Sequence, residues 1–394
     1  MDKIDELLTR GVSEVIIRDS LKKELKTKTK MRIKYGIDPT GPKIHIGRAI
    51  PIWALRKFQE FGHQVVLIIG DFTAQIGDAS DKTAERQILT PEEIKNNMKT
   101  YIEQLGLILD MKKVEIHYNS EWLDAMSAGD LIRAAMNFTV NQMIKRDNFF
   151  QRFEADKPIG LHEIMYPLLQ GYDSVAIKAS IEIGGNDQLF NLLAGRTLQK
   201  KYGQKEQNVM TFDLLMGTDG RKMSTSYGNC IYIQDEPNEM FGKIMSIRDD
   251  LIIQYMTLVT DMKTSEIEKI EKELLGGMNP RDAKIILGKA LVSRYYDDKK
   301  ADDAAENFAN VFKNNEMPEE IREFEVLDKE WRIVDLMHFI GLVPSKTEAR
   351  RMIDQGGVRI DGAVIGDREA QIRPTDKMII QIGKRKFVRI KLDK

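Results

Sequence analysis

Two short segments that lie far apart in the chain carry side chains suited to phosphate chemistry. His45-Ile-Gly-Arg48 lies near the beginning of the chain, and Lys222-Met-Ser-Thr-Ser226 starts 177 positions later. Each segment alone is short enough to occur by chance. Together and in this order, they predict a site that transfers adenylate from ATP.

The first segment follows a predicted strand and turn. Asp38-Pro-Thr-Gly41 stands at the carboxyl end of that strand, where open α/β sheets bind their ligands. His45 lies at the start of the next helix, whose free N–H groups favour phosphate oxygens. Gly47 has no side chain, so a base or ribose can lie close to the backbone. Taken alone, His45 is more simply a surface helix residue, but the strand and turn before it favour a nucleotide site.

The second segment predicts a mobile cation. Gly217 and Gly220 precede Lys222 and make the loop mobile. A lysine on such a loop can move onto the β- and γ-phosphates and stabilise the charge that builds up on a leaving pyrophosphate. No general base is needed, because an attacking carboxylate is already ionised. Taken alone, the segment is more simply a flexible basic loop.

Polar side chains on an apolar segment predict a second part of the ligand site. Tyr166, Gln170 and Asp173 have i, i+4, i+7 spacing and share one face of a predicted helix. Burying these groups is costly without polar partners, which a small amphoteric ligand could supply. A solvent-facing stripe is the alternative. Residues 182–188 end a further strand with glycines, a carboxylate and an amide, which suits ribose hydroxyls and a ligand carboxylate.

These residues need an α/β scaffold to position them. The alternation in 31–37 predicts a strand, the apolar spacing in 46–61 predicts a helix, and the apolar run 65–69 predicts a buried strand. A strand, a helix and a strand in this order begin a doubly wound parallel sheet of the Rossmann-like class. Further strands are expected at 114–118 and 181–183.

Helical segments interrupt and follow the predicted sheet. Residues 121–171 have a helical pattern rich in methionine and phenylalanine. This composition fits either a buried core or an insertion that forms a dimer interface. Residues 231–324 are helical and charged, and the polar segment 314–323 has the composition of a linker.

The composition narrows the class of protein. The 394 residues are 42% hydrophobic and 31% charged, as in a globular chain of two or three domains. Cys230 is the single cysteine, which excludes an internal disulfide and a cysteine-based metal site, and the five histidines are too dispersed for a local zinc motif. We therefore expect no protein-bound metal. The acidic first residues do not resemble a signal peptide, and no run approaches a membrane-spanning length, so a cytoplasmic location is expected.

The charge is distributed unevenly along the chain. The net charge is −1, but residues 331–394 carry 14 lysine and arginine residues against 8 acidic ones, which leaves −7 on the first 330 residues. A basic tail on an acidic body predicts binding of a polyanion, with RNA or DNA as the first candidates. The alternative is a solvated run of charge.

The pattern of the tail indicates a small packed domain. Residues 345–348 have capping-box spacing, and Arg350 and Arg351 lie on the helix that they open. Residues 358–365 predict a hairpin with an Asp-Gly turn. Residues 384–389 interleave basic with aromatic and aliphatic side chains, which suits a phosphate-binding surface.

In combination, these residues resemble the bacterial tyrosyl-tRNA synthetases, a family of class I aminoacyl-tRNA synthetases. The resemblance covers nearly the whole chain and rests on segments 36–40, 45–48, 77–78, 166–173, 184–188 and 222–226. The tail resembles an RNA-binding domain shared with a ribosomal small-subunit protein, the S-four type. The resemblance implies a Rossmann-like catalytic domain at 1–226 with a helical insertion at about 121–171, an α-helical domain at 227–324 and an α+β RNA-binding domain at 331–394.

The resemblance also implies a reaction and a set of site residues. The substrates would be L-tyrosine, ATP with Mg²⁺ and tRNA(Tyr), without a tightly bound cofactor, and the protein would be a homodimer. The implied catalytic residues are His45, Thr40, Lys222 and Thr225. The implied ATP-binding residues are Gly47, Arg48, Gly185, Asp187, Lys222, Met223 and Ser224. The implied tyrosine-binding residues are Tyr35, Asp38, Thr73, Asp78, Tyr166, Gln170, Asp173 and Gln188. The implied tRNA-binding residues are Arg350, Arg351, Arg359, Lys384, Arg385 and Lys386.

Three positions depart from the residues usual in this family. Arg48 stands where the first signature usually ends in histidine, and Thr225 stands where the loop usually has a second lysine. Lys34 stands where many bacterial relatives have a tyrosine that also touches the phenol. Asp173 would then recognise the tyrosine hydroxyl nearly alone, or Tyr35 would help.

Two other functions fit parts of the pattern. A tryptophanyl ligase shares the fold, but it normally lacks the tail, and Asp173 would suit an indole only by meeting its N–H. A non-catalytic RNA-binding protein on a synthetase scaffold is the second alternative, and the unusual residues Arg48 and Thr225 are its basis.

Overall fold

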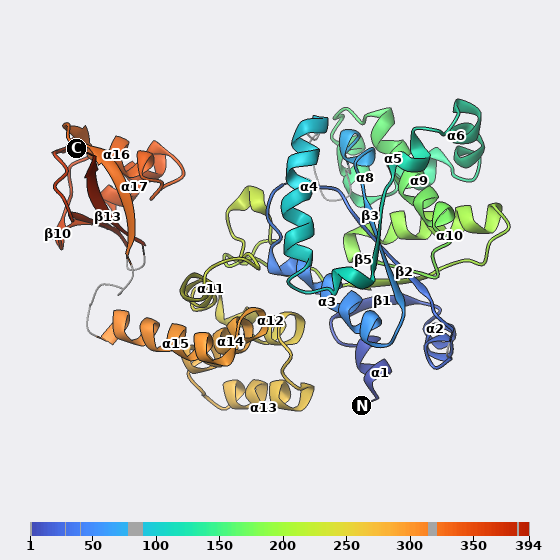
Figure 1. Ribbon diagram of the computed structural model, residues 1–394, viewed down its shortest axis with the longest axis horizontal. Coiled ribbons are helices and arrows are strands. Elements are labelled where there is room, and N and C mark those ends of the chain that lie inside the picture. Colours follow the sequence, from blue (N-terminus) through green and yellow to red (C-terminus); the bar gives the residue numbers. More distant parts are fainter. Residues whose placement is uncertain are drawn as a thin grey trace. The chain divides into compact units, whose positions relative to one another are not determined.

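The computed structural model describes residues 2–27, 29–39, 41–77, 90–313, 321–383 and 386–393. Four residues with expected roles lie outside the described ranges, namely Thr40, Asp78, Lys384 and Arg385. The chain divides into two units, Met1–Ala301 and Asp302–Lys394, and each is described by itself (Figure 1). Within the described residues, no helix has both the length and the apolar character needed to cross a membrane.

A six-stranded sheet with the order β1-β6-β5-β2-β3-β4 forms the centre of the first unit. Its strands are β1 (Val12–Ile16), β2 (Arg32–Ile37), β3 (Gln64–Ile69), β4 (Val114–Tyr118), β5 (Ile181–Gly185) and β6 (Asn208–Phe212). Strands β2 to β6 run parallel, whereas β1 pairs antiparallel with β6 at one edge. The expected doubly wound sheet is therefore confirmed, with an antiparallel edge strand that the sequence pattern did not indicate.

The strand order reverses between β2 and β5. From β2 the chain adds β3 and β4 on one side, and from β5 it adds β6 on the other. Because parallel crossovers are right-handed, α3 (Ile46–Glu60) and α10 (Leu189–Lys201) cover opposite faces of the sheet. A crevice opens at such a reversal, at the carboxyl ends of the two central strands. Both signature segments of the sequence lie beside it.

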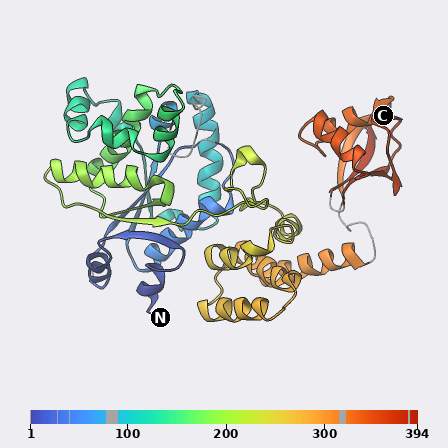
Figure 2. The same ribbon diagram turned by 180° about the vertical axis from the view of Figure 1, so that it is seen from behind.

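Several helices complete the part of this unit that contains the sheet, as Figures 1 and 2 show from opposite sides. They are α1 (Lys3–Leu7), α2 (Arg18–Leu25), α4 (Pro91–Leu105), α5 (Ser120–Leu123), α6 (Ala128–Ala135), α7 (Val140–Ile144), α8 (Asp147–Glu154) and α9 (Leu161–Ala176). The helical insertion expected at about 121–171 corresponds to α5 through most of α9. A buried ion pair between Arg152 Nη1 and Glu163 Oε2, 2.6 Å long, joins α8 to the start of α9 and so fixes the helix that carries the polar stripe.

The helical segment after the sheet also belongs to the first unit. It comprises α11 (Pro237–Ile244), α12 (Ile252–Val259), α13 (Thr264–Leu275), α14 (Pro280–Tyr295) and the start of α15 (Asp298–Lys313). Helix α14 packs against α3, where Trp53 Nε1 donates a hydrogen bond to the Tyr295 hydroxyl at 3.1 Å. The buried Arg294 guanidinium lies 4.0 Å from the centre of the Trp53 ring, a cation–π contact across the same boundary.

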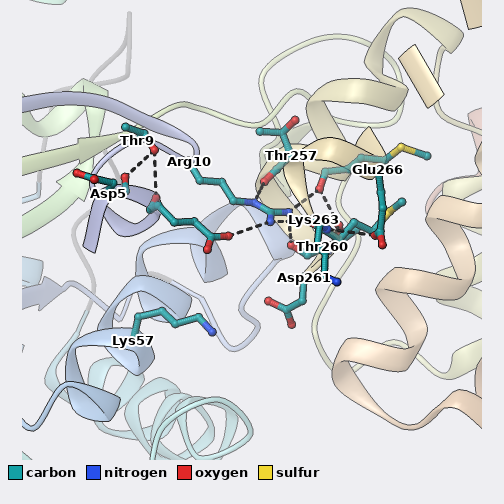
Figure 3. Close-up of polar contacts among 12 residues, drawn as sticks. Asp5, Thr9, Arg10, Lys57, Thr257, Thr260, Asp261, Lys263 and Glu266 are labelled. Atoms are coloured by element: carbon teal, nitrogen blue, oxygen red, sulfur yellow. Dashed lines mark hydrogen bonds and ion pairs between the residues drawn. The ribbon is translucent and has the colours of Figure 1, made fainter. Parts of the chain in front are cut away.

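Arg10, just before β1, connects the N-terminal segment to the helical segment (Figure 3). Its guanidinium donates to four backbone carbonyls at the end of α12, those of Met256, Thr257, Thr260 and Met262, at 2.5–3.2 Å. The last carbonyls of a helix lack partners within the helix and carry partial negative charge. The planar fork of an arginine satisfies several of them at once.

The second unit is a small α+β domain with its own apolar core. Its five-stranded sheet has the order β10-β9-β12-β13-β7, and β11 pairs with β8 beside it. The strands are β7 (Arg322–Leu327), β8 (Trp331–Arg332), β9 (Val358–Ile360), β10 (Ala363–Val364), β11 (Gln371–Ile372), β12 (Ile379–Ile382) and β13 (Lys386–Asp393). Helices α16 (Ile333–Phe339) and α17 (Lys346–Asp354) supply buried side chains to the same core.

The second unit contains the predicted hairpin and one strand that was not predicted. The hairpin of β9 and β10 is present, and its turn residues Asp361 and Gly362 have φ of 46° and 86°, as the favoured two-residue turn requires. Strand β7 pairs along β13, and its Val326 is part of the core. The sheet of this domain therefore starts ahead of residue 331, because β7 belongs to it and begins within the segment 227–324 that we expected to be helical.

Replacing Arg10 with alanine should lower the free energy of unfolding by about 2–3 kcal/mol, because several partly buried hydrogen bonds to a charged group are lost together. Urea unfolding of both proteins measures the difference. The matched control is Arg56→Ala, which removes only an exposed pair with Glu60 and should cost less than about 0.5 kcal/mol. Equal losses in the two variants would show that Arg10 does not stabilise this boundary.

Candidate active site

A cavity of about 530 Å³ lies at the reversal of strand order. His45 from the first signature segment and Lys222 from the second both line it, and so do Tyr166, Gln170 and Asp173 from α9. Segments that are separated by up to 177 positions in the sequence thus border one cavity. Its two ends differ in chemistry and are described in turn.

One end of the cavity presents hydrogen-bond acceptors suited to an amine. Asp38, at the end of β2, accepts hydrogen bonds from the Thr73 hydroxyl and the Tyr166 hydroxyl, both at 2.8 Å. The side-chain oxygen of Gln170 is buried without a hydrogen-bond partner among the described residues. A buried acceptor without a partner is costly unless a ligand supplies a donor, and an ammonium group supplies three.

Gly70 leaves room for the Asp38 carboxylate and the Thr73 hydroxyl to meet. A β-carbon at this position would lie 2.0 Å from Asp38 Oδ1 and 2.3 Å from the Thr73 hydroxyl. Any side chain at residue 70 would therefore displace both groups. The glycine lets the end of β3 pass directly beneath this part of the site.

The other end is built around the buried Asp173. Trp122 Nε1 donates a 2.8 Å hydrogen bond to Asp173 Oδ1, and the Asn119 side chain is a further hydrogen-bond partner. Burial raises the pKa of Asp173 to about 7, although nearby Lys34 and these two hydrogen bonds oppose the rise. The carboxyl lines the cavity and can share a hydrogen bond with a ligand hydroxyl.

Trp122 and Asn119 were missing from the predicted site. Both follow β4 directly, at the same edge of the sheet as Asp38 and Gly70. Asn119 also donates to the Thr73 hydroxyl at 3.0 Å, so it connects the two ends of this half of the cavity. The signal that could have indicated them was their position after a predicted strand.

Lys34 lies beneath the cavity and does not line it. Its ammonium is fully buried and contacts the Gln170 carbonyl, the Ser174 hydroxyl and Glu182 Oε1, each at 2.8 Å. All three donors of the lysine are thereby satisfied within the protein. Lys34 therefore supports α9 from below and takes no part in contacting a ligand hydroxyl.

Tyr35 follows Lys34 on β2, and its side chain points to the opposite face of the strand from that of Lys34, because successive side chains of a strand alternate. The groups that act on its hydroxyl are Arg48, Tyr101 and Asp187, and burial raises its pKa. Arg48 and Asp187 line the part of the cavity expected to bind the nucleotide. Its surroundings thus place Tyr35 away from Asp173 and give no support for its expected role beside a phenol.

His45 is a neutral group at the start of α3. Burial lowers the pKa of its imidazole to about 3, and the positive charges of Arg48 and Lys222 act in the same direction. Its Nδ1 accepts a hydrogen bond from the backbone N–H of Arg48 at 3.2 Å, which makes it the N-cap of the helix. Its other ring nitrogen is then the protonated one and can donate to a phosphate oxygen.

Gly47 and Arg48 complete the first turn of α3. A β-carbon on Gly47 would lie 3.2 Å from the His45 ring, so a side chain there would crowd the imidazole. Arg48 lines the cavity, and its guanidinium donates to the Tyr101 hydroxyl of α4 at 2.7 Å. The arginine that replaces the usual histidine is therefore held by a buried tyrosine from a neighbouring helix.

Lys222 forms an ion pair across the cavity. Its ammonium lies 3.0 Å from Asp187 Oδ2, and both side chains are partly exposed. Asp187 belongs to η3 (Asn186–Gln188), directly after β5, and Gly185 precedes it. A β-carbon on Gly185 would lie 2.6 Å from Asp187 Oδ1. Lys222, the residue expected to bind phosphate, thus contacts Asp187, the residue expected to bind the ribose.

The remaining signature residues fold as a short loop. Met223 is buried and its N–H donates to the Leu215 carbonyl at 3.0 Å. The Ser224 N–H donates to Asn229 Oδ1 at 2.9 Å. Thr225 opens η4 (Thr225–Tyr227), and its side chain hydrogen-bonds those of Tyr232 and Cys230. Gln188 also lines the cavity and accepts a 2.9 Å hydrogen bond from Asn191.

The expected RNA-binding residues lie on three elements of the second unit. Arg350 and Arg351 are exposed on α17, and Arg351 pairs with Glu348 in a bidentate contact. Arg359 is exposed on β9, and Lys386 begins β13. Their expected role in RNA binding remains a prediction.

Comparisons with known proteins place the chain. The family described as tRNA synthetases class I (W and Y) matches residues 26–313, and the S4 domain family matches residues 331–377. The tyrosine–tRNA ligase of Thermotoga maritima is 47% identical over 98% of this chain and 96% of its own length. The tyrosine–tRNA ligase of Mannheimia succiniciproducens is 46% identical over 97% of each chain.

Solved structures agree with the fold. A C-terminally truncated mitochondrial tyrosyl-tRNA synthetase from Aspergillus nidulans has a TM-score of 0.63 and 22% identity, and the match covers 79% of this chain and 94% of that one. A tyrosyl-tRNA synthetase from Archaeoglobus fulgidus complexed with L-tyrosine has a TM-score of 0.61 and 22% identity, and that match covers 77% and 99%.

The raised pKa of Asp173 predicts a pH-dependent stability. Because its folded value of about 7 exceeds the ordinary 3.8, the folded protein holds a proton that the unfolded chain has released between these values. Stability should therefore fall as the pH rises through this window. Asp173→Asn removes the titration, so its free energy of unfolding relative to wild type should rise by up to about 1.4 kcal/mol per pH unit between pH 5 and 7.

Urea unfolding at pH 5, 6, 7 and 8 measures this difference for the two proteins. A difference that stays constant from pH 5 to 8 would mean that Asp173 ionises at an ordinary value.

Proposed function

The chain belongs to the class I tRNA synthetases for tryptophan and tyrosine, and we propose that it is a tyrosine–tRNA ligase. The carboxylate of L-tyrosine attacks the α-phosphorus of ATP, which forms the C–O–P bond of tyrosyl-adenylate and breaks the bond to pyrophosphate. The tyrosyl group then passes to the terminal adenosine of tRNA(Tyr), and AMP leaves. The arrangement of amine acceptors, Asp173 and Lys222 around one cavity carries the proposal.

The amino acid fits between Asp38 and Asp173, two of the residues that line the cavity. The α-ammonium meets Tyr166 and the unpartnered oxygen of Gln170, with Asp38 behind them. The phenol hydroxyl meets Asp173, which Trp122 and Asn119 hold in place. A buried carboxyl at this depth favours a substrate with a hydroxyl over phenylalanine, because phenylalanine would leave it without a ligand partner.

ATP binds in the part of the cavity lined by His45, Asp187 and Lys222, and its arrival changes the partners of two side chains. The ribose hydroxyls take the place of Lys222 as partners of Asp187. The released ammonium moves to the β- and γ-phosphates and stabilises the charge of the departing pyrophosphate. His45 remains neutral and donates a hydrogen bond, so it adds no charge to the phosphates. Mg²⁺ arrives with ATP as part of the substrate.

We also propose a homodimer that forms through the helical insertion. Large apolar side chains are at least half exposed on this insertion, namely Ile132, Met136, Val140, Phe150, Phe153 and Leu161. Exposed aromatic and methionine side chains in a cluster of elements favour a protein interface over a solvated surface. The reaction takes place in the cytoplasm, where tRNA and ATP are available.

Lys222→Ala should slow tyrosine-dependent ATP–pyrophosphate exchange by about 10²-fold, because a positioned cation is lost from the transition state. Tyrosine affinity, measured by calorimetry, should change little. The matched control is Lys200→Ala, which removes an exposed lysine that pairs with Glu206. It should leave both the exchange rate and the tyrosine affinity unchanged. A large loss of tyrosine affinity in Lys222→Ala would contradict the assigned role.

The exchange assay also tests the substrate. Tyrosine-dependent exchange in the unaltered protein supports the proposal. Exchange with tryptophan alone would make it a tryptophanyl ligase, and no exchange with any amino acid would make it a non-catalytic protein.

Removing residues 321–394 should separate the two reactions. Exchange should persist, because the cavity lies wholly within the first unit. Charging of tRNA(Tyr) should fall by about 10²-fold or more, because basic contacts to RNA phosphates are lost. The deletion starts at 321 so that β7 is removed with its sheet. Normal charging by the shortened protein would show that this unit does not hold tRNA.

A further inference from the structure

The cations on the cavity wall differ in how they are held. Among the described residues, Lys43, Arg48 and Lys222 are the lysine and arginine side chains that line it. Arg48 is bound to Tyr101, and Lys222 is paired with Asp187. Lys43 is exposed, and no carboxylate of the described residues pairs with it. A pyrophosphate carries several negative charges, so one lysine on the signature loop neutralises only part of them.

The Lys43 ammonium lies over the ring of Tyr232, which lines the same cavity. It is 5.3 Å from the centre of the Tyr232 ring, a cation–π distance. The Tyr232 side chain in turn hydrogen-bonds the side chain of Thr225, three residues after Lys222. Lys43 therefore stands on the same wall as Thr225, whose short polar side chain brings no charge to it.

A second lysine touches the same ring but is already neutralised. The Lys243 ammonium lies 5.5 Å from the Tyr232 centroid. It also lies 2.6 Å from Asp235 Oδ2 and 2.8 Å from Glu239 Oε1. Moving it onto a phosphate would break two ion pairs, whereas moving Lys43 breaks none among the described residues.

The backbone that carries Lys43 is fixed on both sides. The buried Gln104 of α4 accepts a 2.7 Å hydrogen bond from the Ile44 N–H and donates a 2.8 Å bond to the Pro42 carbonyl. The Ile44 carbonyl accepts a 3.0 Å hydrogen bond from the Ile233 N–H, next to Tyr232. A flexible side chain thus extends from a rigid base two residues before His45.

We propose that Lys43 binds the leaving pyrophosphate and supplies positive charge that the signature loop lacks at Thr225. The inference rests on the proposed adenylate-forming reaction. The bond from the α-phosphorus to the bridging oxygen breaks, and the electron pair stays on pyrophosphate, where Lys43 and Lys222 share its charge. No proton moves to or from Lys43.

Steady-state ATP–pyrophosphate exchange with tyrosine tests this role. Lys43→Ala should lower kcat for exchange by about 10-fold and raise the KM for pyrophosphate, an effect below that of a fully buried donor because Lys43 is exposed. The KM for tyrosine should not change. Lys112→Ala removes an exposed lysine outside the cavity and should change none of these values.

A second substitution distinguishes a charge effect from a structural one. Thr225→Lys places an ammonium on the same wall, so it should restore most of the exchange rate of Lys43→Ala and raise that of the unaltered protein much less. Unchanged kinetics in Lys43→Ala, or the same factor from Thr225→Lys in both backgrounds, would overturn the inference. Absence of tyrosine-dependent exchange in the unaltered protein would overturn the proposed function, and the inference with it.

Discussion

The buried ion pair between Lys34 and Glu182 supports the whole site. The two residues face each other on β2 and β5, the strands between which the sheet order reverses. Isolated charges at this depth would be costly, but here each is surrounded by hydrogen-bond partners. Glu182 also accepts from Ser174 and Gln207, and Lys34 reaches the Gln170 carbonyl. The pair thereby fixes α9 above the crevice, and with it the groups that would bind tyrosine.

The cavity is built so that charges change partners and proton transfer is unnecessary. The pKa of His45 lies far below neutrality, so its imidazole acts as a hydrogen-bond donor. The ion pair of Lys222 with Asp187 holds the proposed cation and the proposed ribose-binding carboxylate at the cavity. Such an arrangement suits a reaction in which the attacking carboxylate is already ionised. The ion pair that would have to open is partly exposed, and such pairs contribute little to stability.

Local patterns in the sequence predicted most of the scaffold but only part of the site. The strands at 65–69 and 114–118, the helix from residue 46 and the polar stripe on α9 follow from periodicity, which acts over a few residues. The reversal between β2 and β5 then brought the predicted side chains together. Trp122, Tyr101 and the buried position of Lys34 were not predicted, because contacts across elements leave no periodic signal. Strand β1 was also not predicted. It pairs with β6, which lies almost 200 residues later in the chain, and such a pairing leaves no local signal.

The N-terminal segment makes its main connections to parts of the chain that are synthesised much later. Strand β1 pairs with residues 209–212, and Arg10 binds carbonyls up to residue 262. At roughly 5–20 residues per second, a ribosome needs on the order of 10–50 s to add the intervening residues. During translation the first residues to emerge are thus among the last to find their partners, and the edge formed by β1 can be completed only after β6 has been synthesised.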